Sequence, residues 1–432
     1  MGTRKARERT QPDQTVVMLL LGDVTGDGRV IKTARAIQHT GRQVTLYCCA
    51  PDRSSRPLPD LEGASVRWVT ARRPLSRLIE LARRLRQIGR ARTGVRATST
   101  GGKPRPAVPA GPAGPRVLRE LRAFLGTLRL NLVMARAVRE PGRVIHAHDL
   151  DTLLAGVLLR RRFRARLVYD AHELYPEMLA TVSPLYAGAW RLLEHWLIRR
   201  ADAVITVNQS IAVELQRRHH LAVLPTVVMN CPPVEQQPPA SPAGAQEPIA
   251  LLYHGGFQQG RGLEELVQAM AHVDDRATLL LRGSGPLHEE LERLARAAGV
   301  ERRVRFLPPV SPDQLVAAMA GCTIGIVPYL PTSLNNYLCT PNKLFDYMMG
   351  GLAVVATDLP ELRRVVQEWH AGLVYQPDDA CGIADSINGL IGDPRRLAQC
   401  RAAARRAALE RFNWEAQSAQ LVQVYAGLAM TR

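Results

Sequence analysis

The segment TPNKLFDYMMGGLAVVATD (340–358) places a cation and a carboxylate near the start of an expected helix. Thr340 is expected to cap this helix, and Pro341 suits its first turn. The free amide N–H groups and the positive end of the helix dipole favour an anion there, and Lys343 adds a full charge. Asp346, on the same face, could accept hydrogen bonds from the vicinal hydroxyls of a ribose. This order suits a nucleoside diphosphate, although such a pair is also common as a simple capping pair.

Two glycine-rich turns point to the same ligand. In YHGGFQQGRGLEELVQAM (253–270), glycines let the backbone approach a ligand, and Arg261 stands where a helix is expected to begin. LLLRGSGPLHEEL (279–291) repeats the pattern with Arg282 and Gly283 after a strand. Neither segment matches GxxxxGK[ST] or GxGxxG, so a P-loop or a dinucleotide fingerprint is disfavoured. Three strand–turn–helix junctions in one half therefore predict one polyanionic ligand.

Apolar runs alternate with helical patterns along both halves, which predicts βαβ units and parallel sheets. The expected strands are 15–22, 43–50, 65–71, 143–149, 165–173 and 201–209 in the first half, and 249–256, 278–285, 304–309, 322–329 and 352–358 in the second. The fold class is therefore α/β, with two doubly wound, Rossmann-like domains that face each other across a cleft. Ligands are expected at the carboxyl ends of the strands.

The expected domain organisation follows the composition. Residues 1–230 form the first domain, with a flexible insert at about 94–115 whose Pro, Gly and Ala content is typical of disorder. Residues 231–248, rich in Pro, Ala and Gln, are typical of a linker. Residues 249–413 form the second domain. Residues 414–432 are expected to form a helix that packs back on the first domain.

The bulk properties narrow the class of protein. The chain has 432 residues, of which 46% are hydrophobic, and no apolar run is long enough to span a bilayer. The N-terminus lacks the features of a signal peptide, so a cytoplasmic protein is expected. The seven cysteines show no CxxC and no metal-ligand spacing, which is typical of reduced, buried thiols.

The net charge of +18 is concentrated in the first half. Residues 1–230 carry 39 Lys and Arg against 18 Asp and Glu, whereas residues 231–432 carry 18 against 21. Two expected helices, 72–92 and 116–139, carry apolar stripes beside arginines; the second stripe comprises Leu118, Leu121, Leu125, Leu128 and Leu132. Such helices bind anionic membrane surfaces. The alternative is a domain-surface helix with a solvated arginine face.

Taken together, these motifs resemble the GT-B glycosyltransferases, in particular the retaining enzymes of family 4. The resemblance rests on HGGF, RGLEEL, RGSGP and PNKLFDYMMGGLAVVATDLPEL in the second half. The first half adds GDGRVIKTARAIQHTGRQVTLY, VIHAHDLDTLLAG and LVYDAHELYPE in the family's order. The resemblance covers nearly the whole chain. It implies a sugar transferase that uses a nucleotide-sugar donor, needs no metal ion and has no other cofactor.

The resemblance also implies roles for individual residues. Arg261 and Lys343 would hold the donor diphosphate and stabilise the leaving group, and His148 would line the cleft near the reacting carbon. The implied donor-binding residues are Gly255, Gly256, Arg261, Arg282, Gly283, Thr340, Pro341, Asn342, Lys343, Leu344 and Asp346. The implied acceptor-side residues are Asp27, Arg29, His146, Asp149, His172 and Glu173. The strongly basic acceptor half implies a phosphorylated or lipid-linked acceptor, and association with an anionic bilayer through residues 72–139.

Three positions depart from the family's pattern. Leu338 stands where the first glutamate of the family's Glu–seven residues–Glu motif is expected, and Asp346 replaces the second. Phe257 stands in place of the usual arginine after the first glycine turn. The missing glutamate leaves the contacts to the donor sugar, and hence the sugar, open.

Two other functions compete with sugar transfer. A nucleotide-sugar epimerase of the same fold needs acidic pairs near the sugar, and Leu338 speaks against it. Nucleic-acid binding fits the basic first half, but no RNA- or DNA-binding signature is present, and aromatic residues make up only 5%, too few for a stacking platform. We therefore expect a nucleotide-sugar donor and a glycan or lipid-linked acceptor as partners, and no nucleic acid.

Overall fold

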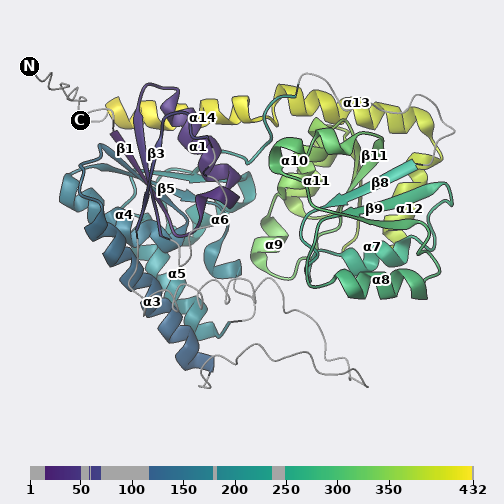
Figure 1. Ribbon diagram of the computed structural model, residues 1–432, viewed down its shortest axis with the longest axis horizontal. Coiled ribbons are helices and arrows are strands. Elements are labelled where there is room, and N and C mark those ends of the chain that lie inside the picture. The colour runs from purple at the N-terminus through teal and green to yellow at the C-terminus, as the bar shows by residue number, and fades with distance from the viewer. Residues whose placement is uncertain are drawn as a thin grey trace, which may run out of the picture.

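The computed structural model describes residues 15–49, 58, 60–69, 116–178, 182–235 and 249–430. It contains one parallel sheet of seven strands and one of six, each with helices on both faces, and the two halves lie side by side (Figure 1). This confirms the predicted fold class. The expected helix at 72–92 and the insert at about 94–115 lie outside the described residues.

The first sheet has the strand order β3-β2-β1-β4-β5-β6-β7. Its strands are β1 Thr15–Leu20, β2 Gln43–Cys48, β3 Ser65–Trp68, β4 Val144–His148, β5 Arg166–Ala171, β6 Ala203–Thr206 and β7 Thr226–Val227. Residues 16 to 19 of β1 are fully buried. Both faces of the strand are therefore apolar, and the sequence does not alternate between apolar and polar residues as in a half-exposed strand. The order reverses between β1 and β4, so the carboxyl ends of these strands border a crevice.

Polar residues start the helices of the first domain. Asp27, Ser183 and Asn208 each accept a backbone N–H in the first turn of the helix that follows. The α-helices are α1 Gly28–Gln38, α3 Arg116–Ala137, α4 Leu150–Phe163, α5 Pro184–Ile198 and α6 Gln209–His219, and the 3-10 helices are η2 Val24–Gly26 and η3 Tyr175–Met178. Helices α3, α4 and α5 bury one face of the sheet, and α1 covers the other.

The second sheet has the order β10-β9-β8-β11-β12-β13 and reverses between β8 and β11. Its strands are β8 Ile249–His254, β9 Ala277–Arg282, β10 Val304–Leu307, β11 Cys322–Val327, β12 Ala353–Thr357 and β13 Gly372–Tyr375. The helices are α7 Leu263–Ala269, α8 His288–Ala297, α9 Leu334–Leu338, α10 Asn342–Met349, α11 Pro360–Glu368, α12 Ala380–Ile391 and α13 Pro394–Glu410, with η4 Pro312–Gln314 and η5 Ala317–Met319. Two separate apolar clusters, one on each face of the sheet, hold these helices.

The last helix, α14 (Trp414–Met430), returns to the first domain, where it runs along α1 (Figure 1). Leu421, Tyr425 and Leu428 join the apolar cluster of β1 and α1. The Tyr425 hydroxyl lies 2.7 Å from His146 Nδ1 on β4. The amide of Trp414 donates to the carbonyl of Pro232, so the two chain crossings between the domains lie side by side.

Helix α3 lies on the sheet differently from the sequence prediction. Of the predicted apolar stripe, Leu118, Leu121, Leu125 and Leu132 are exposed, and Ala123, Leu130 and Met134 face the core instead. Helix α3 is thus a domain-surface helix that exposes leucines as well as arginines, and this agrees with the alternative of a solvated arginine face. No helix in the described ranges is both long and apolar enough to cross a bilayer.

Candidate active site

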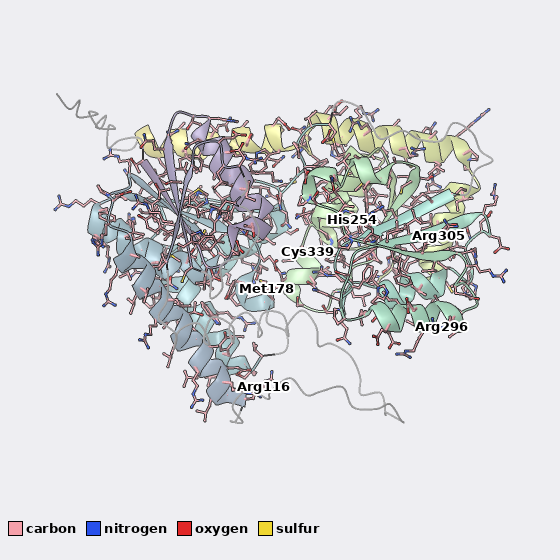
Figure 2. The ribbon with its side chains drawn as sticks, viewed as in Figure 1. Arg116, Met178, His254, Arg296, Arg305 and Cys339 are labelled. Carbon is pink, nitrogen blue, oxygen red and sulfur yellow. The ribbon has the colours of Figure 1, made fainter. Side chains whose placement is uncertain are left out.

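A cavity of about 280 Å³ lies between the two domains, at the carboxyl ends of both sheets. Its first-domain wall includes Asp27, Arg29, His172, Glu173 and Met178, and its second-domain wall includes Gln259, Arg261, Tyr329, Thr332, Ser333, Asn335, Asn336, Cys339, Thr340, Pro341 and Asn342. Met178 and Cys339 mark the facing walls in Figure 2. The position agrees with the general rule that ligands of doubly wound sheets bind at the strand-order reversal.

Two cations from different elements of the second domain meet at one aromatic ring. The Arg261 guanidinium lies 4.2 Å from the centre of the Tyr329 ring, and Lys343 Nζ lies 5.3 Å from it and 3.6 Å from the Tyr253 ring. Within the described ranges neither cation has an ion pair or a hydrogen bond. Burial, and then Arg261, hold the pKa of Lys343 well below its usual range. Arg261 belongs to the cavity wall and Lys343 does not, and in the described ranges neither has a carboxylate within ion-pairing distance, so the two adjacent cations favour an anion.

Helix α10 begins one residue later than predicted. Pro341 is the N-cap, without a side-chain cap, and Thr340 turns away so that its Oγ1 accepts a hydrogen bond from Asn208 of the first domain. The role of Thr340 as a helix cap is therefore corrected: Pro341 is extended, with a φ of −64° and a ψ of 136°, so the helix starts after it, and the Thr340 hydroxyl bonds the first domain instead. Asn342 and the main chain around it line the cavity, whereas Leu344 is fully buried in the core.

Asp346 lies behind Lys343, one helical turn on. Its Oδ2 is 3.3 Å from His254 Nε2 at the end of β8, and its exposed fraction is 9%. His254 Nε2 has no hydrogen-bond partner within the described ranges. A ribose near Asp346 would meet both groups.

The glycine turns bring backbone next to the cations. Gly255 has a φ of 130°, and a Cβ there would lie 3.1 Å from Lys343 Nζ. Gly283 has a φ of 151°, and a Cβ there would lie 2.0 Å from the carbonyl oxygen of Gly255. Gly256 accepts a hydrogen bond from the Tyr253 hydroxyl. These two turns support each other and leave no room for side chains.

Arg282 does not reach this cavity. Its Nη1 donates to the carbonyl of Pro308 at 3.3 Å, and it does not belong to the cavity wall. Arg282 therefore does not line the cavity with Arg261, and its expected role at the donor stays a prediction.

On the first-domain side, Asp27 and Arg29 come from the loop between β1 and α1, and both line the cavity. Asp27 Oδ1 caps α1 through the amide of Val30. Arg29 is held by Asp170 through bonds of 3.0 and 2.6 Å and donates to the carbonyl of Val228. Although burial opposes it, Arg29 keeps the pKa of Asp170 well below its usual range.

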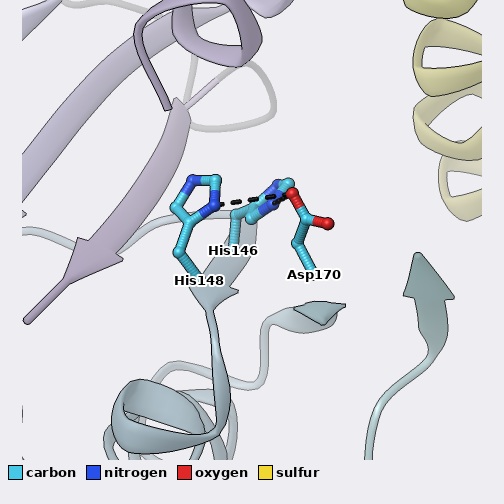
Figure 3. Close-up of side chains that lie close together, drawn as sticks. All are labelled: His146, His148 and Asp170. Carbon is cyan, nitrogen blue, oxygen red and sulfur yellow. Dashed lines mark ion pairs between the residues drawn. The ribbon is translucent and has the colours of Figure 1, made fainter. Parts of the chain in front are cut away.

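Behind this pair, two histidines of β4 converge on Asp170 (Figure 3). His146 Nε2 and His148 Nδ1 lie 3.6 and 3.5 Å from Asp170 Oδ2, and both imidazoles are fully buried. Burial lowers the pKa of both histidines. The expectation that His146 or His148 lines the cleft is therefore corrected: neither belongs to the cavity wall, and His172 takes that position.

The same three residues could reach one metal ion, since their ligand atoms lie within 4.8 Å of one another. Both carboxylate oxygens of Asp170 already accept from Arg29, however. A cation bound there would stand next to a guanidinium and would compete with it for the one negative charge. The donor set therefore suits a charge-balanced scaffold better than a metal centre.

His172 and Asp149 form a polar pair in front of the buried histidines. Asp149 Oδ1 accepts from the amide of His172 at 3.0 Å, and the backbone of Asp149 has a φ of 60° and a ψ of 165°. This conformation is almost confined to glycine, and such strain often marks a functional site. Burial opposes protonation of His172, but Asp149 and Asp170 outweigh it and raise the pKa of His172 to about 9. The cavity therefore receives a further cation from the first domain.

Leu338 and Phe257, two of the three positions that depart from the family's pattern, have structural roles. Leu338 packs against the core of the first domain, and its carbonyl accepts a hydrogen bond from Asn208 at 2.8 Å. Phe257 is fully buried between Tyr253, His288 and Phe306. Neither side chain belongs to the cavity wall.

Sequence reasoning missed several residues of the site. Tyr253 and Tyr329 carry the cations, and Asn335 links the domains by accepting from the amide of Leu174 and donating to Glu173. The sequence could have indicated Tyr253 and Tyr329, because each stands near the end of a strand and just before a turn that contains glycine or proline. The pairing of Asn335 across the domains left no local signal in the sequence.

Two family models match the chain. "Glycosyl transferase 4-like domain" matches residues 89–231, and "Glycosyl transferases group 1" matches residues 248–393, so together they span about two thirds of the chain. Among relatives, D-inositol 3-phosphate glycosyltransferase of Xylanimonas cellulosilytica is 28% identical over 324 residues, which cover 68% of this chain and 75% of the relative. Glycogen synthase of Mycobacterium tuberculosis is 24% identical over 290 residues, covering 65% and 68%.

Solved structures agree on the fold. Sucrose-phosphate synthase of Thermosynechococcus elongatus superimposes with a TM-score of 0.71 at 20% identity, covering 96% of this chain and 99% of that one. HepE of Anabaena, solved in complex with UDP, gives a TM-score of 0.68 at 17% identity, with coverage of 96% and 100%. The two sheets, the cavity between them and the two family models lead to one conclusion: the chain is a glycosyltransferase of the GT-B fold and belongs with the family 4-like enzymes.

Proposed function

We propose that the protein transfers a sugar from a nucleoside-diphosphate donor to a hydroxyl acceptor, with retention at the anomeric carbon. The observation that carries this proposal is the pair of cations Arg261 and Lys343, which meet at Tyr329 without a carboxylate partner in the described ranges. A buried cation is costly unless a ligand neutralises it. A diphosphate supplies two negative groups of the right kind at this position.

The remaining donor contacts follow from this placement. The start of α10 at Pro341 and Asn342 would offer backbone amides to a phosphate, and the turn at Gly255 and Gly256 would approach it from β8. Asp346 with His254 would receive the ribose. HepE, which has the same fold, was solved with UDP, and this supports a nucleotide in such a cleft.

The chemistry would be mainly electrostatic. When the bond between the anomeric carbon and the diphosphate oxygen breaks, negative charge builds on that oxygen, where Arg261 and Lys343 already stand. If the acceptor approaches the same face of the sugar, the departing oxygen lies within reach of the acceptor's proton. The acceptor oxygen then forms the new bond to the anomeric carbon and retains its configuration. Because two protein cations supply the compensating charge, we propose that no metal ion is required.

The donor test uses titration calorimetry after a thermal-shift screen of UDP-, GDP-, ADP- and dTDP-sugars. Arg261→Ala and Lys343→Ala should each weaken donor binding by about tenfold or more, as expected for a lost hydrogen bond to a charged group. Arg276→Ala is the matched control, because Arg276 is exposed and, among the residues that the structure describes, pairs only with Asp274. Unchanged donor affinity in both site variants would refute the proposal.

We further propose that the first domain, residues 1–230, binds the acceptor and that α3 rests on an anionic bilayer, at the cytoplasmic face of the membrane. Val117, Leu118, Leu121 and Leu125 are exposed on α3 next to Arg119 and Arg122. An exposed apolar row flanked by arginines is the arrangement of helices that lie in a lipid interface. A lipid-linked or phosphorylated glycan would then be the acceptor.

The membrane proposal is tested by flotation with liposomes. Binding to vesicles that contain anionic lipid should exceed binding to neutral vesicles, and Leu121→Ser with Leu125→Ser should reduce it. Val213→Ser removes an exposed apolar side chain from α6 and serves as the control. Equal recovery with neutral and anionic vesicles would overturn this proposal and leave the donor site untouched.

A further inference from the structure

The donor sugar must meet polar groups at the end of the cavity that lies beyond the diphosphate cations. In the resembling family a glutamate at the position of Leu338 would serve there. In this protein the α9 segment carries Leu338 against the core of the first domain. The hydrogen bond from Asn208 to the Leu338 carbonyl fixes this orientation. A carboxylate for the sugar must therefore come from elsewhere.

The cavity wall contains two carboxylates, Asp27 and Glu173. Asp27 is engaged as the cap of α1. Glu173 follows β5 and reaches across to the second domain, where its Oε2 accepts from Asn335 Nδ2 at 3.0 Å. Asn335 Oδ1 accepts in turn from the amide of Leu174 at 2.9 Å, and Asn335 is 5% exposed. One hydrogen bond from Asn335 thus holds the Glu173 carboxylate at the junction of the domains, and a second bond fixes Asn335 to the amide of the next residue, Leu174.

Glu173 belongs to the first domain, yet it shares the cavity with residues of the second domain, where the donor is proposed to bind. Glu173 shares the cavity wall with Arg261 and Cys339, two residues of the second domain. Thr332, Ser333 and Asn336, from α9 and the residues just before it, line the same cavity. The Glu173 carboxylate therefore shares one cavity with Arg261 and with these polar residues.

We propose that Glu173 accepts hydrogen bonds from hydroxyl groups of the donor sugar and takes the part that Leu338 cannot play. A carboxylate is a strong acceptor for hydroxyl donors, and its fixed position would select sugars that present hydroxyls to it. Because Asn335 holds Glu173 from the other domain, sugar recognition requires both domains in contact. This inference rests on the proposed function and names the residue that reads its sugar.

Paired ligands separate the sugar contact from the diphosphate contact. Calorimetry compares a nucleoside diphosphate with the corresponding nucleotide sugar, starting with UDP and UDP-glucose and using the pair that the screen identifies. Glu173→Gln keeps an oxygen that can accept from Asn335 but removes the charge. We expect its affinity for the nucleotide sugar to fall by about tenfold or more, the range for a lost charged hydrogen bond, with the affinity for the diphosphate alone unchanged.

The controls address a merely structural role. Glu177→Gln lies four residues on and pairs with Arg191 and Arg218 outside the cavity, so it should bind both ligands as the wild type does. Adding Leu338→Glu to Glu173→Gln should not restore affinity, because position 338 faces the first domain. Wild-type affinity of Glu173→Gln for the nucleotide sugar, or rescue by Leu338→Glu, would overturn this inference alone. A wild-type chain that binds no nucleotide would overturn the proposed function and this inference with it.

Discussion

Replacing Lys343 by methionine should make the ligand-free protein more stable while it weakens diphosphate binding by about tenfold or more. Lys343 is 6% exposed and has no ion pair or hydrogen bond in the described part of the chain. Replacing buried charged groups by apolar ones of similar size often gains about 1–4 kcal/mol. The loss of the cation–π contact with Tyr253, worth up to about 2 kcal/mol, opposes this gain. We expect a net increase in the free energy of unfolding on the order of 1 kcal/mol.

Differential scanning calorimetry with and without the nucleoside diphosphate gives the decisive comparison. Without ligand, Lys343→Met should unfold about 2 °C above the wild type. At a ligand concentration of about 100 times the wild-type Kd, the wild type gains about 2.7 kcal/mol. A variant that binds tenfold more weakly gains only about 1.4 kcal/mol, so it loses its advantage. Lys32→Met is the matched control. Lys32 Nζ donates to the Cys231 carbonyl at 2.5 Å, so the same substitution there should lower stability.

The pH dependence has a defined sign. Because the folded-state pKa of Lys343 is depressed, the unfolded state binds more protons between that pKa and 10.5. Wild-type stability therefore rises with pH through this window, and the advantage of the variant shrinks. A ligand-free variant less stable than the wild type, combined with undiminished stabilisation by the diphosphate, would refute the reasoning about the unpaired cation.

Three further outcomes follow. Because the pKa of His172 is raised to about 9, its protonation stabilises the folded state by at most about 3 kcal/mol. This stabilisation should be complete below pH 6.5 and should be lost as the pH rises toward 9. The free energy of unfolding of His172→Gln, measured in urea, should lack this decline. Gly262→Ala should lower the free energy of unfolding by several kcal/mol, because a Cβ would lie 1.7 Å from the Pro328 carbonyl oxygen. Gly299 has a similar φ and open space around it, so Gly299→Ala should lower it by only about 1–2 kcal/mol. Equal losses of stability in thermal unfolding would contradict the clash at position 262. Tyr425→Phe should lower the free energy of unfolding by about 1 kcal/mol in denaturant titration, and an unchanged value would show that its contact with His146 contributes nothing.

The fold was accessible from the sequence because buried parallel strands are continuous apolar runs. Each expected strand was found, and its carboxyl end lies one to three residues before the expected one, as for β1 at Thr15–Leu20. Strands β7 and β13 were missed. β7 has two residues, and β13 (GLVY) is only partly buried, so neither has a run long enough to stand out.

The site was accessible only in part. The cations Arg261 and Lys343 follow from local patterns, because a residue type at a turn or helix start is visible in the chain. Packing between distant elements decides which face of α3 is buried. It also decides which histidine of the segments HAHDL and DAHEL reaches the cavity. The bond between Asn335 and Glu173 joins residues 162 positions apart, and no local pattern encodes it.

The course of the chain through the two domains has a consequence for synthesis. The first domain needs Leu421, Tyr425 and Leu428 of α14 to complete its core, yet these residues are translated after the whole second domain. At about 5–20 residues per second, the ribosome spends roughly ten to forty seconds on the intervening chain. During this time the apolar surface of β1 and α1 that α14 later covers is exposed on the nascent first domain, and a chaperone could bind there.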